Sequence, residues 1–159
     1  MKGILIDVDY QTIKKGDVDF AIARIFFKTK EATIEAYDKN FFYYFYVEAK
    51  KSQLQNFGNF LKIEEVEKYF LGEKKKLCKV FVTHPKYARE ELPFNVYGAD
   101  IPFNRLYLME KGLFPLRAYE FEINEEKELL SIKQLSKEEE EEIQKEIKLK
   151  TFCFDIEVR

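Results

Sequence analysis

Apolar and polar residues alternate with a period of two along much of the first 40 residues, and this pattern predicts β-strands. We expect strands at 3–9, 18–28 and 32–37, with a turn at 15–17. Residues 41–47 read FFYYFYV and are apolar on both faces, which indicates a central strand. We expect one compact domain whose sheet includes the strands at 3–9, 18–28 and 41–47.

Helical spacing replaces this alternation in three later segments. Residues 49–61 carry apolar side chains at helical intervals. A second helix is expected at 102–111, with Asp100 as its amino-terminal cap and Gly112 at its end. A third, rich in glutamate, is expected over 137–148.

Further short strands are expected in the second half of the chain. They are predicted at 66–71, 77–82, 119–123, 129–132 and 151–158. Strands outnumber helices and mostly follow one another. The sequence therefore predicts the α+β class, with a mixed or antiparallel sheet and packed helices in two layers.

Composition narrows the class of protein. The 159 residues suit one domain, or one domain with an extension, and 46% hydrophobic residues are enough for a packed core. Cys78 and Cys153 are far apart and His84 is the only histidine, so we expect no zinc site and reduced thiols. No segment resembles a membrane span or a signal peptide, so we expect a cytoplasmic location and no membrane partner. We also expect a monomer.

The net charge of −2 argues against a general polyanion-binding protein. Residues 1–120 hold 20 Lys and Arg against 17 Asp and Glu (+3), whereas 121–159 hold 7 against 12 (−5). Much of this acidity lies in Glu138–Glu142, which is expected to be a solvated helix face. Nucleic acid could therefore contact the first part only locally, through a salt-sensitive attraction.

Two carboxylates stand near the end of the chain. Asp155 and Glu157 belong to an apolar segment expected to be a strand, where they would share one face roughly 7 Å apart. Carboxylates so placed can bind a pair of divalent cations that activates water against a phosphodiester. An acid-rich chain can also produce this spacing by chance, so both interpretations stay open.

Four short motifs occur in order along the chain: LIDVDY at 5–10, F-x-x-Y-x-Y at 41–46, DIPF at 100–103 followed by YL at 107–108 and KGLxP at 111–115, and FDIE at 154–157. Taken in this order, they resemble the amino-terminal domain of archaeal family B DNA polymerases. Their order and spacing extend over the whole chain. The resemblance implies a template-binding domain at 1–135, then at 136–159 a helix and the first strand of an RNase H-like 3′–5′ exonuclease domain.

The resemblance also implies a site and partners. In that family the domain lies beside single-stranded template DNA and binds flipped-out uracil in a pocket. The residues at pocket positions are Tyr10, Tyr44, Ala88, Ile101 and Phe103. The physical basis is general, because an unpaired base leaves its stack at small cost and can then lie between apolar groups. The rest of a polymerase chain would be a further partner.

In such a polymerase, Asp155 and Glu157 would be the first exonuclease carboxylates and would bind Mg²⁺ or Mn²⁺ together with residues beyond this chain. For the present chain alone we expect no cofactor and neither nuclease nor polymerase activity.

Three positions depart from the family pattern. Tyr43 replaces a proline, Ala88 stands where valine is typical, and Leu106 stands where an arginine is expected. A smaller wall and a bulkier tyrosine would reshape the pocket. We therefore expect the preference for uracil over thymine to shrink or disappear.

The sequence is also compatible with other functions. The chain could be a free-standing single-strand-binding protein derived from such a module. An unrelated RNA-recognition domain would carry the signature [K/R]-G-[F/Y]-[G/A]-F-V-x-[F/Y], which this sequence lacks. The aromatic residues of 41–47 also suit a hydrophobic core as well as a base-binding surface.

Overall fold

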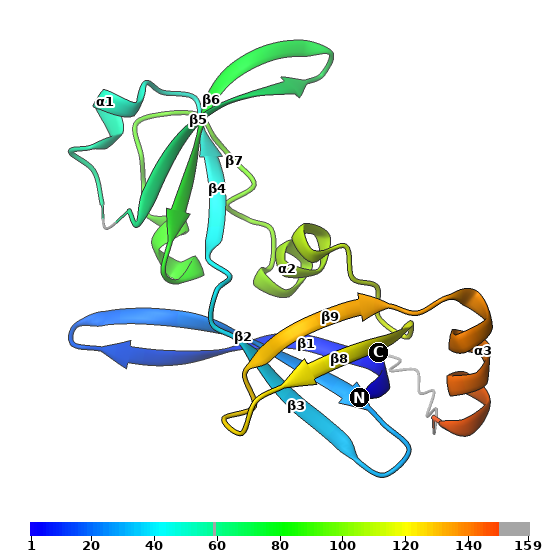
Figure 1. The fold of residues 1–159 in the computed structure, drawn as a ribbon. Helices are drawn as coiled ribbons and strands as arrows, with labels where there is room; N and C mark the ends of the chain where they lie inside the picture. The colour runs from blue at the N-terminus through cyan, green and yellow to red at the C-terminus, as the bar shows by residue number, and fades with distance from the viewer. Residues whose placement is uncertain (59, 150–159) are drawn as a thin grey trace, which may run out of the picture.

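The computed structural model describes residues 1–58 and 60–149, whose strands form two antiparallel sheets (Figure 1). The five-stranded sheet has the order β3-β2-β1-β8-β9, with β1 Lys2–Lys15, β2 Val18–Lys28, β3 Thr33–Asp38, β8 Ala118–Ile123 and β9 Leu129–Gln134. The four-stranded sheet has the order β5-β6-β4-β7, with β5 Lys62–Phe70, β6 Glu73–Val82, β4 Tyr43–Val47 and β7 Val96–Tyr97.

The prediction that these strands share one sheet is wrong. The strands predicted at 3–9 and 18–28 pair as β1 and β2, but the strand predicted at 41–47 belongs to the other sheet. Its central position is confirmed, because β4 pairs with β6 on one side and β7 on the other. The α+β prediction thus holds in a coarser form, as antiparallel sheets with few helices. Apolar alternation identifies a strand but not the sheet that it joins.

The helices are α1 Lys51–Leu54, the 3-10 helix η1 Pro85–Arg89, α2 Phe103–Lys111 and α3 Lys137–Glu146. The helix expected at 49–61 is wrong beyond its first turn. Gly58 has a left-handed φ of 58°, and the Phe57 and Phe60 rings contact Phe94 and Phe45 from irregular chain. These tertiary contacts replace the helical ones that the spacing predicted.

Helix α2 matches the prediction closely at its end and less well at its start. Gly112 caps it in the left-handed conformation, as expected. Pro102, rather than Asp100, is the residue at the amino-terminal cap, so the predicted capping role of Asp100 is wrong. The helix contacts both β1 and β4, and Figure 1 places it between the two sheets.

Backbone and side-chain bonds hold the two sheets together beside η1. The amide of Ala21 in β2 donates to the carbonyl of Thr83 at 2.8 Å, and the Thr83 hydroxyl donates to the carbonyl of Asp19 at 2.8 Å. The Asp19 amide donates to the Tyr87 hydroxyl at 3.1 Å. One hydrophobic core also runs through both sheets and α2. The sheets therefore present a fixed junction to the site described below.

The carboxyl-terminal part follows the prediction with one exception. The strands expected at 119–123 and 129–132 are present as β8 and β9, which pair with each other, and α3 begins at a Ser136–Glu139 capping box. Glu140 is not on a solvated face, since it is 5% exposed and accepts a bond from Arg117 Nε at 2.6 Å. The strand expected at 151–158 lies outside the described residues. None of the helices in residues 1–58 and 60–149 combines the length and the hydropathy that a membrane-spanning helix requires.

Candidate nucleic-acid interface

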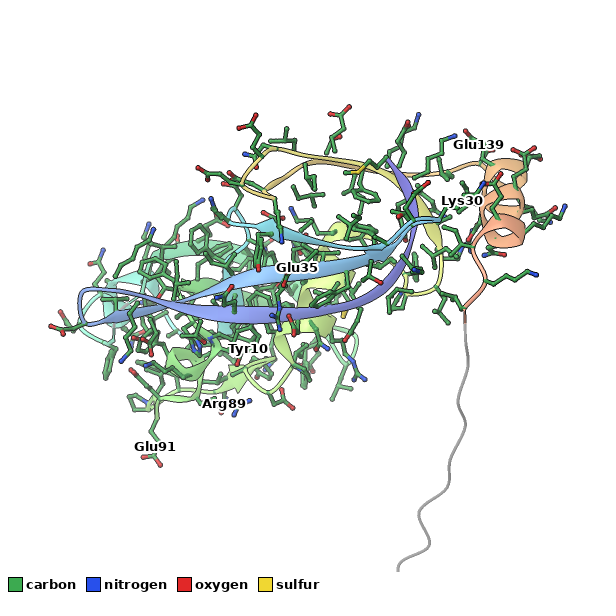
Figure 2. The ribbon with its side chains drawn as sticks, turned by 90° about the horizontal axis from the view of Figure 1, so that it is seen from below. Tyr10, Lys30, Glu35, Arg89, Glu91 and Glu139 are labelled. Atoms are coloured by element: carbon green, nitrogen blue, oxygen red, sulfur yellow. The ribbon has the colours of Figure 1, made fainter. Side chains whose placement is uncertain are left out.

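A cavity of about 250 Å³ opens where β1, η1 and the start of α2 meet. Its lining consists of Asp9, Tyr10, Pro85, Arg89, Ile101, Pro102, Phe103 and Asn104. Three residues expected at a pocket, Tyr10, Ile101 and Phe103, are thus brought together from distant parts of the sequence. Figure 2 shows Tyr10 and Arg89 near each other in the lower part of the view.

Two aromatic rings give the cavity its apolar character. Tyr10 projects from β1 and is 38% exposed, whereas Phe103 at the start of α2 is 3% exposed. Their ring centroids lie 4.9 Å apart with a 47° tilt. The accessible Tyr10 ring is therefore supported from below by a buried one, an arrangement that suits a flat aromatic ligand.

His84 supports the Tyr10 ring from another side. The two ring centroids are 5.5 Å apart in an edge-on contact. The Lys86 amide donates to His84 Nδ1 at 3.1 Å, so Nδ1 is an acceptor and Nε2, 3.1 Å from the Thr12 hydroxyl oxygen, carries the proton. Burial lowers the pKa of His84, which favours this neutral form.

Tyr43 fixes the loop that carries Ile101. Its hydroxyl donates to the Ile101 carbonyl at 2.6 Å, and the carbonyl oxygens of Gly98 and Ala99 lie 3.3 and 3.2 Å away. Its ring is nearly parallel to Phe103, at 6.4 Å between centroids. Burial raises the pKa of Tyr43, so the hydroxyl remains a donor. Tyr43, which stands where the resemblance implies a proline, thus supports the cavity from behind.

The rim of the cavity carries both signs of charge. Asp9 accepts two bonds from Arg24, at 2.7 Å from Nε and 2.6 Å from Nη2, and this pairing raises the pKa of the guanidinium. Arg89 supplies a cation in the lining. Position 106, where an arginine is expected, is occupied by a leucine that is 3% exposed. The sequence did not identify Arg89 as a site residue. Its only signal there is that it directly follows Ala88, the residue expected to form the wall.

Two of the expected pocket residues do not line this cavity. Tyr44 points to the other face of β4, where its hydroxyl donates to Glu110 at 2.7 Å and Lys79 Nζ lies 3.7 Å from its ring centroid. Burial is the main cause that raises its pKa. Ala88 is buried in η1 at 3% exposure and is absent from the lining, unlike its neighbour Arg89.

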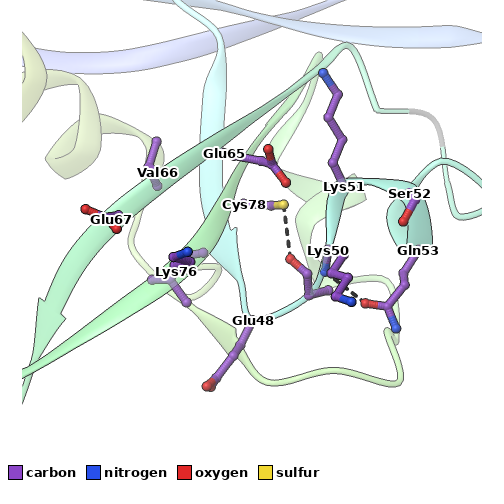
Figure 3. A pocket seen from close by; sticks show the side chains of 12 residues that line it. Glu48, Lys50, Lys51, Ser52, Gln53, Glu65, Val66, Glu67, Lys76 and Cys78 are labelled. Atoms are coloured by element: carbon purple, nitrogen blue, oxygen red, sulfur yellow. Dashed lines mark hydrogen bonds between the residues drawn. The ribbon is translucent and has the colours of Figure 1, made fainter.

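A larger depression, about 840 Å³, lies elsewhere, between α1 and the β5–β6 hairpin (Figure 3). None of the expected site residues lines it. The Cys78 thiol there donates to the Ala49 carbonyl at 3.2 Å, and burial raises its pKa, which makes it a poor nucleophile. In residues 1–58 and 60–149, no three His, Cys, Asp or Glu side chains are grouped to hold a metal ion. Asp155 and Glu157 lie outside this described part.

Comparison with known proteins links the chain to DNA polymerases, although no family model matches it. It is 31% identical over 137 residues to a DNA polymerase of Thermococcus sp. (strain GE8) and 32% identical to DNA polymerase 1 of Pyrococcus abyssi. Each match includes 74% of this chain, but only 8% and 17% of those proteins.

The fold is similar to a solved structure of the family B DNA polymerase from Pyrobaculum calidifontis. The TM-score is 0.67 at 24% identity, over 84% of this chain and 20% of that one. At this identity the likeness establishes the fold, and the chain corresponds to a small part of the larger protein.

Proposed function

Because this chain is a homologue of archaeal family B DNA polymerases, we propose that it is the amino-terminal DNA-binding module of such an enzyme. In this proposal it contacts the single-stranded template, and the remainder of a polymerase chain is its partner. Polymerase activity belongs to that larger protein and not to this module.

The observation that carries the proposal is the cavity formed by Tyr10, Ile101 and Phe103. An exposed ring backed by a buried one can stack an unpaired base, and such stacking contributes about 1–3 kcal/mol per base. The neighbouring Arg89 can attract a phosphate or stack on the base. The cavity is therefore suited to a single nucleotide taken out of its strand.

Recognition of uracil is the finer part of the proposal. Thymine differs from uracil by one methyl group, and a wall that excludes one methyl group discriminates by about 1–3 kcal/mol. Ala88 does not contribute to this wall, and Arg89 lines the cavity instead. A long, flexible arginine can move aside for a methyl group. We accordingly propose base binding with weak preference for uracil.

The test is titration of two matched fluorescent oligonucleotides that differ by a single uracil or thymine. Both should bind, with affinities that differ by less than about tenfold, equivalent to roughly 1.4 kcal/mol. Tyr10→Ala should weaken both complexes about 5- to 150-fold through lost stacking. Phe114→Ala, which removes a 60% exposed ring outside the cavity, is the matched control.

Two results would contradict the proposal. A hundredfold preference for uracil would show that the cavity wall is tighter than proposed. Equal affinities of the Tyr10→Ala and control variants would remove the base-binding role. The exonuclease and metal-binding roles proposed for Asp155 and Glu157 require a longer chain and are tested there, by Mg²⁺- or Mn²⁺-dependent digestion with and without Asp155→Ala.

A second candidate is a free-standing single-strand-binding protein derived from the same module. The same titration supports it equally, because the cavity would be identical. The two candidate functions are distinguished by a binding measurement between this module and a separately produced polymerase core. A polymerase module should bind the core, whereas a free-standing protein should not.

A further inference from the structure

The four-stranded sheet has a second aromatic surface, on the opposite face of β4 from Tyr43. It consists of Tyr46 on β4, Lys68 and Phe70 on β5, Lys75 on β6 and Tyr97 on β7, and we call it the hairpin platform. The strand register places Tyr46 opposite Tyr97 and Lys68 opposite Lys75, so these pairs project to one side.

The rings and ammonium groups of the hairpin platform are interleaved. The Phe70 and Tyr97 ring centroids are 5.0 Å apart, and Lys75 Nζ lies 5.4 and 5.7 Å from them. Lys68 Nζ lies 5.8 Å from the Tyr46 centroid. Tyr46, Lys68, Phe70 and Tyr97 line a depression of about 310 Å³ together with Tyr69 and Leu77, and Phe70 is 42% exposed. Alternating rings and cations form the pattern that binds stacked bases and their phosphates.

The distribution of charge along the chain also favours binding of an anion near the hairpin platform. Residues 67–76, which form the hairpin tip, hold four lysines and two glutamates (+2), although the whole chain is −2. Helix α3 holds two lysines and six glutamates (−4), and Figure 1 places it at the other end of the molecule. A polyanion is therefore attracted to the hairpin tip and repelled from α3.

One lysine of the hairpin platform is already paired. Lys75 Nζ is 3.1 Å from Glu48 Oε2, and both side chains are partly exposed. The Tyr97 hydroxyl also donates to Glu48 Oε2 at 2.7 Å and lies 3.3 Å from Lys75 Nζ, so a phosphate at Lys75 takes the place of Glu48 in this group of bonds.

We propose that single-stranded DNA binds across the hairpin platform, with bases on Phe70 and Tyr97 and phosphates at Lys68 and Lys75. The choice of DNA rests on the proposed function. The site is separate from the Tyr10 cavity, since the two linings have no residue in common. It binds several nucleotides without selecting a base, because every base has a face that can stack.

The experiment measures binding of a fluorescent oligothymidylate to the whole chain by anisotropy at several salt concentrations. Phe70→Ala should weaken binding about 5- to 150-fold. Lys68→Gln should weaken it and reduce the slope of log K against log salt by about one. Phe114→Ala and Lys30→Gln, both exposed and outside the platform, are the matched controls and should behave as the unchanged protein.

Several outcomes would overturn the proposal. One is unchanged affinity and salt slope in Phe70→Ala and Lys68→Gln, with melting temperatures that show both to be folded. Another is tighter binding of an RNA of matched length. A third is a dimer that Phe70→Ala dissociates without DNA, which would make a second copy the occupant. The proposed base-binding cavity fails separately, when Tyr10→Ala leaves the affinity unchanged.

Discussion

Replacing Tyr43 by phenylalanine tests whether its hydroxyl holds the wall of the Tyr10 cavity. The change keeps the ring, which lies 6.4 Å from that of Phe103, and removes the donor bonded at 2.6 Å to the Ile101 carbonyl. Tyr43 is 1% exposed, so water reaches the freed carbonyl poorly. Leaving a buried acceptor without its donor costs about 1–3 kcal/mol.

This loss should be visible in two measurements. For a chain of this size it corresponds to a fall in melting temperature of roughly 2–12 °C, at about 2–4 °C per kcal/mol. Binding of the uracil oligonucleotide should also weaken, because the 98–101 loop loses its tether. Tyr69→Phe is the matched control for stability, since its side chain is 76% exposed, and should leave the melting temperature unchanged.

The reasoning is refuted if Tyr43→Phe melts at the same temperature as Tyr69→Phe. A melting temperature that falls while uracil binding stays the same would refute the narrower point, that the loop positions the cavity.

Two other predictions concern buried polar groups. The pKa of His84 is lowered in the folded chain, so folding favours its neutral form; stability is complete above its unfolded pKa of about 6.5 and should fall as the pH drops below it. Melting curves from pH 8 to pH 5 should show a smaller fall for His84→Gln than for the unchanged protein. Glu140→Ala should cost about 1–3 kcal/mol, because it leaves Arg117 and a buried amide without their acceptor. Glu141→Ala, one position along the same helix and exposed, should change the unfolding free energy little in the same denaturant titration.

Much of the local structure could be predicted from the sequence, but its assembly could not. The alternation over 18–28 and the run at 41–47 identify strands correctly, since each needs only local side-chain periodicity. Whether two strands share a sheet depends on pairing between distant residues, such as Tyr43 with Val82, and nothing local encodes that. The failed helix at 49–61 has the same cause, because distant aromatic partners outweigh its spacing.

The candidate site shows the same limit at the scale of one residue. Tyr10, Ile101 and Phe103 were expected together and lie together, whereas Tyr44 lies on the opposite face of β4. The resemblance assigns Tyr44 by its position in the sequence, and neighbouring residues of a strand project to opposite faces. Tyr43, noted only as a departure, is the β4 residue that bonds the Ile101 carbonyl and lies beside the Phe103 ring.

Strand β4 is therefore the shared wall of two surfaces. Tyr43 ties the cavity loop on one face, and on the other face Tyr44 bonds Glu110 near the end of α2 while Tyr46 forms part of the hairpin platform. The strand is buried between β6 and β7 and has little freedom to move. A base in the cavity and a strand on the platform would thus be held at a fixed separation, so a single DNA strand can occupy both only if its length and path match that separation. Affinity should then rise with oligonucleotide length until both sites are filled, and this rise should disappear in either Tyr10→Ala or Phe70→Ala.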